Sequence, residues 1–170
     1  MADWKIIYSK RFTLGPMTPW VHRRVGGEEG AAGVYDPPLP LPIPGKGYAT
    51  FRIAIDRFPF TFASLHELDE AIRVLDEPAL PAVTSGVARS KRLPVYRKLD
   101  PYGATARHWI ERLPKQMQGW ARRRKIVWEL KHGRDAIKKA LGPANVARAY
   151  GRDPSAPDDE RSERDSRRDS

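Results

Sequence analysis

The sequence contains no cysteine, which excludes disulfide bonds, thiolate chemistry and zinc sites built on cysteine. It also lacks any run of about 18 apolar residues, the length that a helix needs to cross a bilayer. The segment MADWKIIYSKRF at the start of the chain carries charges at Asp3, Lys5, Lys10 and Arg11 and has no apolar region typical of a signal peptide. We therefore expect a soluble, intracellular protein, and cytoplasmic is the simplest location.

Signatures of known catalytic chemistry are missing as well. Residues 66–70, HELDE, begin like a metalloprotease helix but lack the second histidine four residues after the first. The stretch GGEEGAAG, which starts at Gly26, matches no phosphate-binding spacing, and its two glutamates would repel phosphate. Residues 84–86, TSG, lack the glycine pattern of a nucleophile elbow. The sequence therefore predicts no catalytic residue, no metal site and no cofactor, and a protein that is not an enzyme.

Positive charge is abundant, and it is concentrated in one segment. The formal net charge is +10 over 170 residues. Residues 86–141 hold sixteen Lys and Arg against four Asp and Glu, a surplus of 12, and the segments on either side are each negative by one. Such a field attracts polyanions over a distance set by ionic strength. This segment is therefore the main candidate for a binding site.

Alternating apolar and polar side chains predict a small antiparallel sheet. Residues 4–14, WKIIYSKRFTL, alternate well, although Lys10 interrupts the apolar face and indicates a bend or strand end nearby. Alternation also runs through residues 47–56 and 58–63, so these residues should form a β-hairpin with its turn at Asp56 and Arg57.

A helix over residues 65–76 should cover this sheet. Ser64 and Glu67 have the spacing of a capping box, and Glu67, Asp69 and Glu70 lie near the positive end of the helix dipole. One apolar stripe faces the sheet, made of Leu65, Leu68, Ile72 and Leu75. We expect residues 1–76 to form the core of the protein.

Between the first strand and the hairpin lies an arm without regular period, residues 15–46. Its first part is rich in glycine, whereas residues 37–45, PPLPLPIPG, are stiff because each proline fixes its own φ. We expect the arm to drape over its own domain. The alternative is that a neighbouring subunit covers it.

The second half of the chain is predicted to be helical and basic. Residues 77–100 form a connector. The basic helical segment, residues 101–142, should contain one helix that ends at Leu113, a second over 114–131 that stops at His132 and Gly133, and a short third. This segment either packs beside the sheet or forms a separate lobe. Residues 143–170 should be a mostly disordered tail, with a marginal helix over 145–150. The fold class is therefore α+β: a small three-stranded antiparallel sheet covered by one helix, then the basic segment and the tail.

The basic helical segment offers candidate contacts to phosphate and to bases. Arg122 and the three residues after it wrap most of the way around a helix, and Trp120 and Trp128 flank them at a separation of about two turns. Guanidinium groups there can bind phosphates while an indole stacks on a base. Tryptophans at helical spacing are more often core residues, and on that interpretation Trp109, Trp120 and Trp128 are buried. The candidate set is Arg122, Arg123, Arg124, Lys125, Lys131, Arg134, Lys138, Lys139, Trp120 and Trp128, with Lys91, Arg92, Arg97 and Lys98 as auxiliary residues.

Taken together, these features predict a basic accessory protein that associates with nucleic acid through phosphate contacts, with low sequence specificity. The alternative is a structural or adaptor subunit of a larger assembly. In that case the basic face meets an acidic protein partner, and the proline-rich arm makes further protein contacts. The two hypotheses differ in salt dependence, because contacts to phosphate weaken steeply as salt rises.

Overall fold

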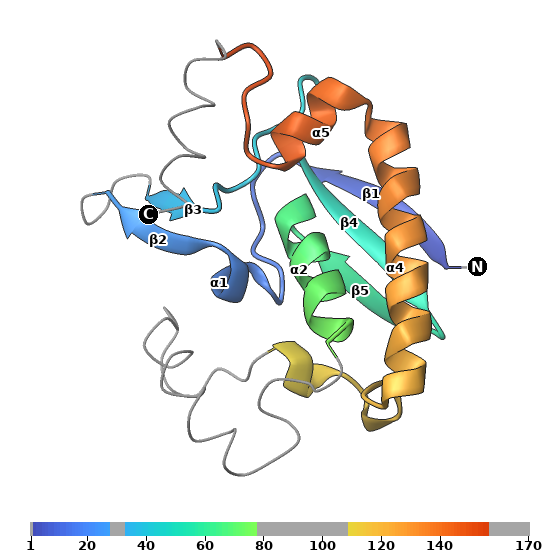
Figure 1. Cartoon of the computed structure of the whole chain (residues 1–170). Helices are drawn as coiled ribbons and strands as arrows, with labels where there is room; N and C mark the ends of the chain where they lie inside the picture. Colours follow the sequence, from blue (N-terminus) through green and yellow to red (C-terminus); the bar gives the residue numbers. More distant parts are fainter. Residues whose placement is uncertain (1, 28–32, 78–108, 157–170) are drawn as a thin grey trace.

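The computed structural model describes residues 2–27, 33–77 and 109–156. Its centre is a three-stranded antiparallel sheet of order β1-β4-β5, made of β1 (Asp3–Ser9), β4 (Tyr48–Ile55) and β5 (Phe58–Phe62). Two helices, α2 (Leu65–Leu75) and α4 (Trp120–Leu141), lie side by side over one face of this sheet (Figure 1). The predicted α+β class and the three-stranded sheet are confirmed, but two helices cover the sheet where one was expected.

The predicted hairpin is present with its turn at the expected residues. Asp56 and Arg57 have φ values of 50° and 68°, the left-handed conformation that a two-residue turn needs to match the twist of its strands. Alternate residues of β4 are fully buried beneath the helices, and Phe51 lies opposite Phe62 in the register. Period-two patterning therefore identified both the strands and their buried face.

Strand β1 is shorter than predicted. Its last residue, Ser9, is paired with Tyr48, the first residue of β4. Just before Tyr48, the backbone of Gly47 passes close to the backbone of Ser9. A Cβ on Gly47 would lie 2.3 Å from the carbonyl oxygen of Ser9. The chain leaves the sheet at Lys10, where the alternation is also broken. The predicted strand over residues 4–14 was therefore too long by five residues.

Helix α4 runs continuously through the predicted stop at His132 and Gly133. A Cβ on Gly133 would lie 2.9 Å from Cδ1 of the fully buried Ile53, so this glycine permits close packing of α4 on β4 and does not end the helix. The expected second and third helices are thus one helix of 22 residues. It is preceded by two short 3-10 turns, η1 (Trp109–Arg112) and η2 (Lys115–Met117). The described part of the basic segment, residues 109–142, belongs to the core and is not a separate lobe.

The arm contains three short elements that the sequence did not predict. They are α1 (Thr18–Val21), β2 (Arg23–Gly26) and β3 (Val34–Asp36), and the two strands pair with each other in a sheet of their own (Figure 1). The proline-rich part packs on α5 (Pro143–Ala149): the backbone N–H of Leu41 donates to the carbonyl of Arg148 over 2.8 Å, and Ile43 is buried. The proline-rich part of the arm lies on its own chain, as expected.

Several predictions fall on residues outside the described part of the chain. These are nearly all of the connector at 77–100, most of the predicted helix ending at Leu113, and the tail from residue 157. Helix α5 covers residues 143–149, close to the marginal helix predicted over 145–150, and a turn follows it. In the described ranges, no helix combines the length and the apolar character that a membrane span requires.

Candidate nucleic-acid interface

Helix α4 divides its side chains between the core, the α2 side and solvent. Ile126, Leu130 and Ile137 are buried against the sheet. Their helical spacing leaves the opposite side of α4 facing away from the sheet over its whole length, about 33 Å at 1.5 Å per residue. Apart from Lys138, the predicted basic residues of this helix fall into three groups, according to what each contacts.

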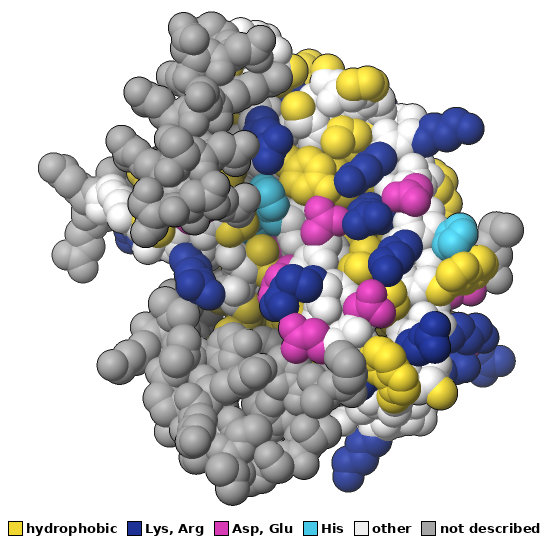
Figure 2. Space-filling model, viewed as in Figure 1, with side chains coloured by type: hydrophobic (Ala, Val, Ile, Leu, Met, Phe, Trp, Pro, Cys, Tyr) yellow, Lys and Arg dark blue, Asp and Glu magenta, His cyan; other side chains and the backbone are white. Residues whose placement is uncertain are grey.

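One group is neutralised by carboxylates. Arg122 pairs with Asp56 of the hairpin turn. On the α2 side, Lys131 Nζ lies 3.2 Å from Asp76 Oδ2, and Arg134 Nη1 lies 2.9 Å from Asp69 Oδ1. Figure 2 shows Lys and Arg interleaved with Asp and Glu where α2 and α4 meet. These ion pairs account for part of the positive surplus that the sequence places in this segment.

Arg123 is a second case, because it is buried with 2% of its surface exposed. Its guanidinium donates to backbone carbonyls at the end of α2 and before α4: Nε to Gln118 over 2.9 Å, and Nη1 to Leu75 over 3.0 Å and to Glu77 over 2.5 Å. The cation holds two helices together and does not face solvent. It therefore does not belong with the exposed residues among which the sequence placed it.

The third group forms what we call the outward face of α4: Trp120, Arg124, Lys125, Trp128, His132 and Lys139. Trp128 is 54% exposed and Trp120 is 42% exposed, so the expectation that all three tryptophans are core residues was wrong for these two and right for the buried Trp109. Within the described ranges, the three cations of this face pair with no carboxylate. Exposed indoles therefore alternate along one helix with cations that no described carboxylate neutralises.

Two contacts orient the aromatic rings of this face. The guanidinium carbon of Arg123 lies 5.1 Å from the centre of the Trp120 ring, a cation–π contact that holds the indole at the start of the helix. The rings of Trp128 and His132 lie 3.9 Å apart between centres, and Nδ1 of His132 bonds the carbonyl of Trp128. Lys138 lies apart from this face, half-buried with its Nζ 5.0 Å from the Tyr150 ring centre.

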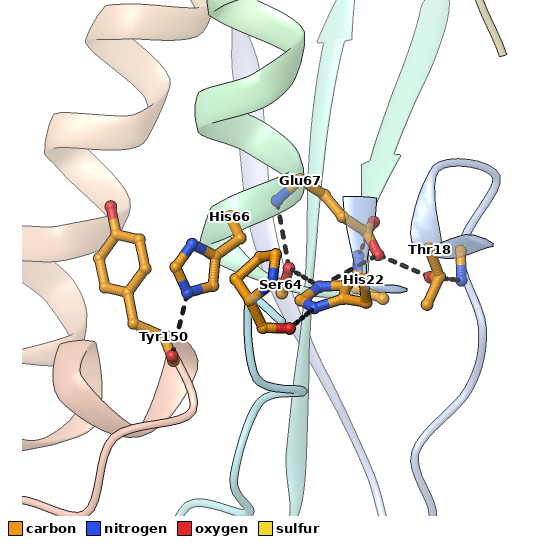
Figure 3. Close-up of polar contacts among 9 residues, drawn as sticks. Thr18, His22, Ser64, His66, Glu67 and Tyr150 are labelled. Atoms are coloured by element: carbon orange, nitrogen blue, oxygen red, sulfur yellow. Dashed lines mark hydrogen bonds and ion pairs between the residues drawn. The ribbon is translucent and has the colours of Figure 1, made fainter. Parts of the chain in front are cut away.

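A second polar cluster, missed by the sequence analysis, lies where α1 meets α2 (Figure 3). Thr18, His22, Ser64 and Glu67 are each at most 3% exposed. Thr18 Oγ1 lies 2.6 Å from Glu67 Oε1, the N–H of Ala63 donates to Glu67 Oε2 over 2.7 Å, and His22 Nε2 lies 2.8 Å from Ser64 Oγ. Burial raises the pKa of Glu67 to about 7 and lowers that of His22.

Only half of the predicted capping box exists. Ser64 Oγ accepts from the backbone N–H of Glu67 over 3.1 Å, as the sequence predicts. The Glu67 carboxyl turns inward to Thr18 and Ala63 instead of acting at the exposed end of the helix dipole. Ser64 and His22 resemble a nucleophile and its base, but both are buried, so a substrate does not reach them in this conformation. Nothing in the sequence marks Thr18 or His22, because the arm around them has no periodic pattern.

A half-exposed group of side chains continues this cluster toward α4 and α5. His66 Nε2 lies 3.1 Å from the carbonyl of Tyr150, whose hydroxyl donates to Asp69 over 2.5 Å. Burial lowers the pKa of His66, and burial together with the Asp69 carboxylate raises that of Tyr150. Across the described residues, no three His, Asp or Glu side chains are grouped so that they could hold a metal ion.

Comparisons of the chain with models of protein families, with curated proteins and with solved structures find no match. Its function is therefore inferred from the geometry and charge of its own surfaces.

Proposed function

We propose that this protein is a non-enzymatic accessory protein that binds nucleic acid on the outward face of α4, through phosphate contacts and with low sequence specificity. The observation that carries the proposal is the alternation of exposed indoles with cations that pair with no carboxylate of the described residues. Trp120, Arg124 and Trp128 follow one another at intervals of four residues, so they lie in one row along the helix.

The two kinds of side chain supply complementary contacts. Lys and Arg bind phosphates without reading sequence, and aromatic rings stack on bases of any identity. A base face is available for stacking in a single strand, whereas neighbouring base pairs cover it in a duplex. The exposed indoles of Trp120 and Trp128 therefore support a preference for single-stranded nucleic acid.

The expected salt dependence follows from the three cations of the outward face. Each phosphate contact to a single strand contributes about 0.7 to the slope of log K against log salt. Arg124, Lys125 and Lys139 together contribute about 2. Between 50 and 200 mM salt, these three residues alone are then expected to lower the affinity about 20-fold.

The adaptor hypothesis keeps only part of its support. An acidic protein could occupy the same basic face. The proline-rich arm is the other element of that hypothesis, and it is hydrogen-bonded to its own chain. Arg148 Nη1 donates to the carbonyl of Pro42, and the N–H of Leu41 donates to the carbonyl of Arg148. The exposed indoles beside the cations can stack on bases, and we favour nucleic acid for that reason.

A titration by fluorescence anisotropy tests the proposal. Labelled single-stranded and double-stranded 20-mers of DNA and RNA are titrated with the full chain at 50 and 200 mM salt. We expect binding at low salt, and at least tenfold weaker binding by the double variant Arg124→Glu, Lys125→Glu. The double variant Lys10→Glu, Arg11→Glu is the control matched in charge, because both are exposed cations far along the chain from α4. The affinity of this control should stay within twofold of the wild type. A wild-type protein that binds none of the oligonucleotides at 50 mM salt refutes the proposal.

A further inference from the structure

The β2–β3 hairpin is joined to the rest of the protein at its base. His22 immediately precedes β2, and Pro37 immediately follows β3. The two strands pair only with each other in the described sheets, and the residues of β2 are all exposed. Figure 1 shows this hairpin standing beside the main sheet and its helices. The contacts at these two ends therefore decide how the β2–β3 hairpin is attached to the rest of the protein.

Both ends are held by His22. Nδ1 of His22 lies 2.8 Å from the carbonyl oxygen of Pro37, which can only accept, so Nδ1 carries the proton. In the neutral ring Nε2 is then an acceptor, and the hydroxyl of Ser64 donates to it over 2.8 Å. Ser64 also accepts from the N–H of Glu67 at the start of α2. A continuous chain of hydrogen bonds thus runs from the end of the hairpin to the helix.

Glu67 anchors the preceding segment of the arm to the same place. Its Oε1 lies 2.6 Å from the hydroxyl oxygen of Thr18, which accepts from the backbone N–H of Gly15 over 2.7 Å. A neutral Glu67 donates its proton across this contact to Thr18, whereas an ionised Glu67 accepts from Thr18 there. Its Oε2 accepts from the N–H of Ala63. Gly15 packs so closely that a Cβ there would lie 3.0 Å from Glu67 Oε2. Residues 15–22 therefore close over the Glu67 carboxyl.

The described surroundings of Glu67 offer no Lys or Arg to balance a negative charge. The nearest titratable group is His22, whose Nε2 lies 3.9 Å from Glu67 Oε1, and its burial disfavours the charged ring. Next on α2 is His66, with its ring centre 5.9 Å from that of His22. Asp69 is engaged by Arg134 of α4 and by Tyr150 after α5. Among the described residues, no Lys or Arg forms an ion pair with Glu67.

We propose that Thr18, His22, Ser64 and Glu67 form a proton-controlled clamp, which holds the β2–β3 hairpin and residues 15–22 on α2 while Glu67 is neutral and releases them when Glu67 ionises. An ionised carboxyl without a cation gains hydration when the segment above it opens. Residues 15–22 bury two apolar side chains, Met17 and Val21, whereas α2 buries six, so residues 15–22 are the part that opens more readily. This inference is independent of the nucleic-acid function.

The direction of the pH effect follows from proton binding. In the closed clamp the pKa of Glu67 is about 7, whereas in an opened state it returns to the ordinary value of 4.5. Raising the pH therefore favours the open state. From pH 5.5 to 8.5, linkage with these two values increases the opening constant about 30-fold.

Hydrogen exchange on the full chain at pH 5.5 and 8.5, corrected for intrinsic rates, measures this opening. We expect the protection of residues 15–26 and 33–37 to be about 30-fold lower at pH 8.5 than at pH 5.5. The protection of α4 should not change in this way. Glu67→Gln imitates the neutral carboxyl and should remove the pH dependence. Glu70→Gln, an exposed neighbour on the same helix, should keep it.

Two results would overturn the proposal. One is equal protection of the hairpin and residues 15–22 at both pH values in the wild type. The other is a Glu67→Gln variant that loses protection as the wild type does. If that variant does not fold, a carbon NMR titration of Glu67 in the wild type decides: a midpoint near 4.5 in place of about 7 contradicts the clamp.

Discussion

Neighbouring arginines on α4 should respond in opposite ways to the same substitution. Arg123→Met removes a buried guanidinium that joins α4 to the carbonyls of Leu75 and Glu77 at the end of α2. Arg124→Met removes an exposed cation of the outward face, which contacts none of these carbonyls. The first change should lower stability, and the second should lower affinity for nucleic acid.

The magnitude for Arg123 follows from its hydrogen bonds. A hydrogen bond to a charged group contributes about 1.5 to 3 kcal/mol, and Arg123 donates three to backbone carbonyls. Methionine keeps the packing of the aliphatic stem, and water can reach the half-buried Glu77, so the full sum is not lost. We expect Arg123→Met to lower the free energy of unfolding by about 3 kcal/mol, and Arg124→Met to change it by less than about 0.5 kcal/mol.

Urea denaturation of both variants and the wild type, followed by circular dichroism, measures these free energies. Anisotropy titrations at a temperature where all three proteins are folded supply the affinities. The reasoning is refuted if Arg123→Met costs less than about 1 kcal/mol, or if Arg124→Met destabilises the protein as much as Arg123→Met does.

Three further predictions concern the core and the buried cluster. Gly133→Val should lower the free energy of unfolding by about 2 kcal/mol, because the valine side chain overlaps Ile53. A Cβ at position 133 would already lie 2.9 Å from Ile53 Cδ1. An unchanged melting temperature would contradict this packing. The folded protein holds the Glu67 proton more tightly than the unfolded chain does. The contribution of Glu67 to the free energy of unfolding should therefore fall by about 3 kcal/mol as pH rises from 4.5 to above 7. Urea titrations at pH 5 and 8 should show this loss in the wild type and not in Glu67→Gln, and equal pH dependence of the two would disprove it. Ser64→Ala removes both the helix cap and the donor to His22, and should cost about 2 kcal/mol in thermal unfolding, whereas the exposed Ser155→Ala should cost nothing.

Local patterns predicted the elements whose stability is decided locally. The β4–β5 hairpin was predictable because period-two alternation and the turn at Asp56 and Arg57 lie within a few residues of each other. The start of α2 was predictable because Ser64 caps a backbone N–H only three residues away. In both cases the sequence signal and the structural cause span the same short stretch.

Features that depend on distant partners were not predictable in this way. Gly133 reads as a helix stop in sequence, and only its packing on Ile53 explains why the helix continues. Glu67 reads as a surface residue of the first turn, and only Thr18, 49 positions earlier, explains its burial. The charge count likewise overstated the exposed surplus, since Arg122, Lys131 and Arg134 meet carboxylates from other elements.

The salt dependence of binding tests the central claim most directly. The slope of log K against log salt for a single-stranded oligonucleotide is compared between the wild type and a variant in which Arg124, Lys125 and Lys139 are all changed to Gln. Because only the difference between the two slopes is used, basic residues elsewhere in the chain cancel. Binding on the outward face of α4 predicts that the slope becomes shallower by about 2. An unchanged slope, with affinity also unchanged, would contradict it.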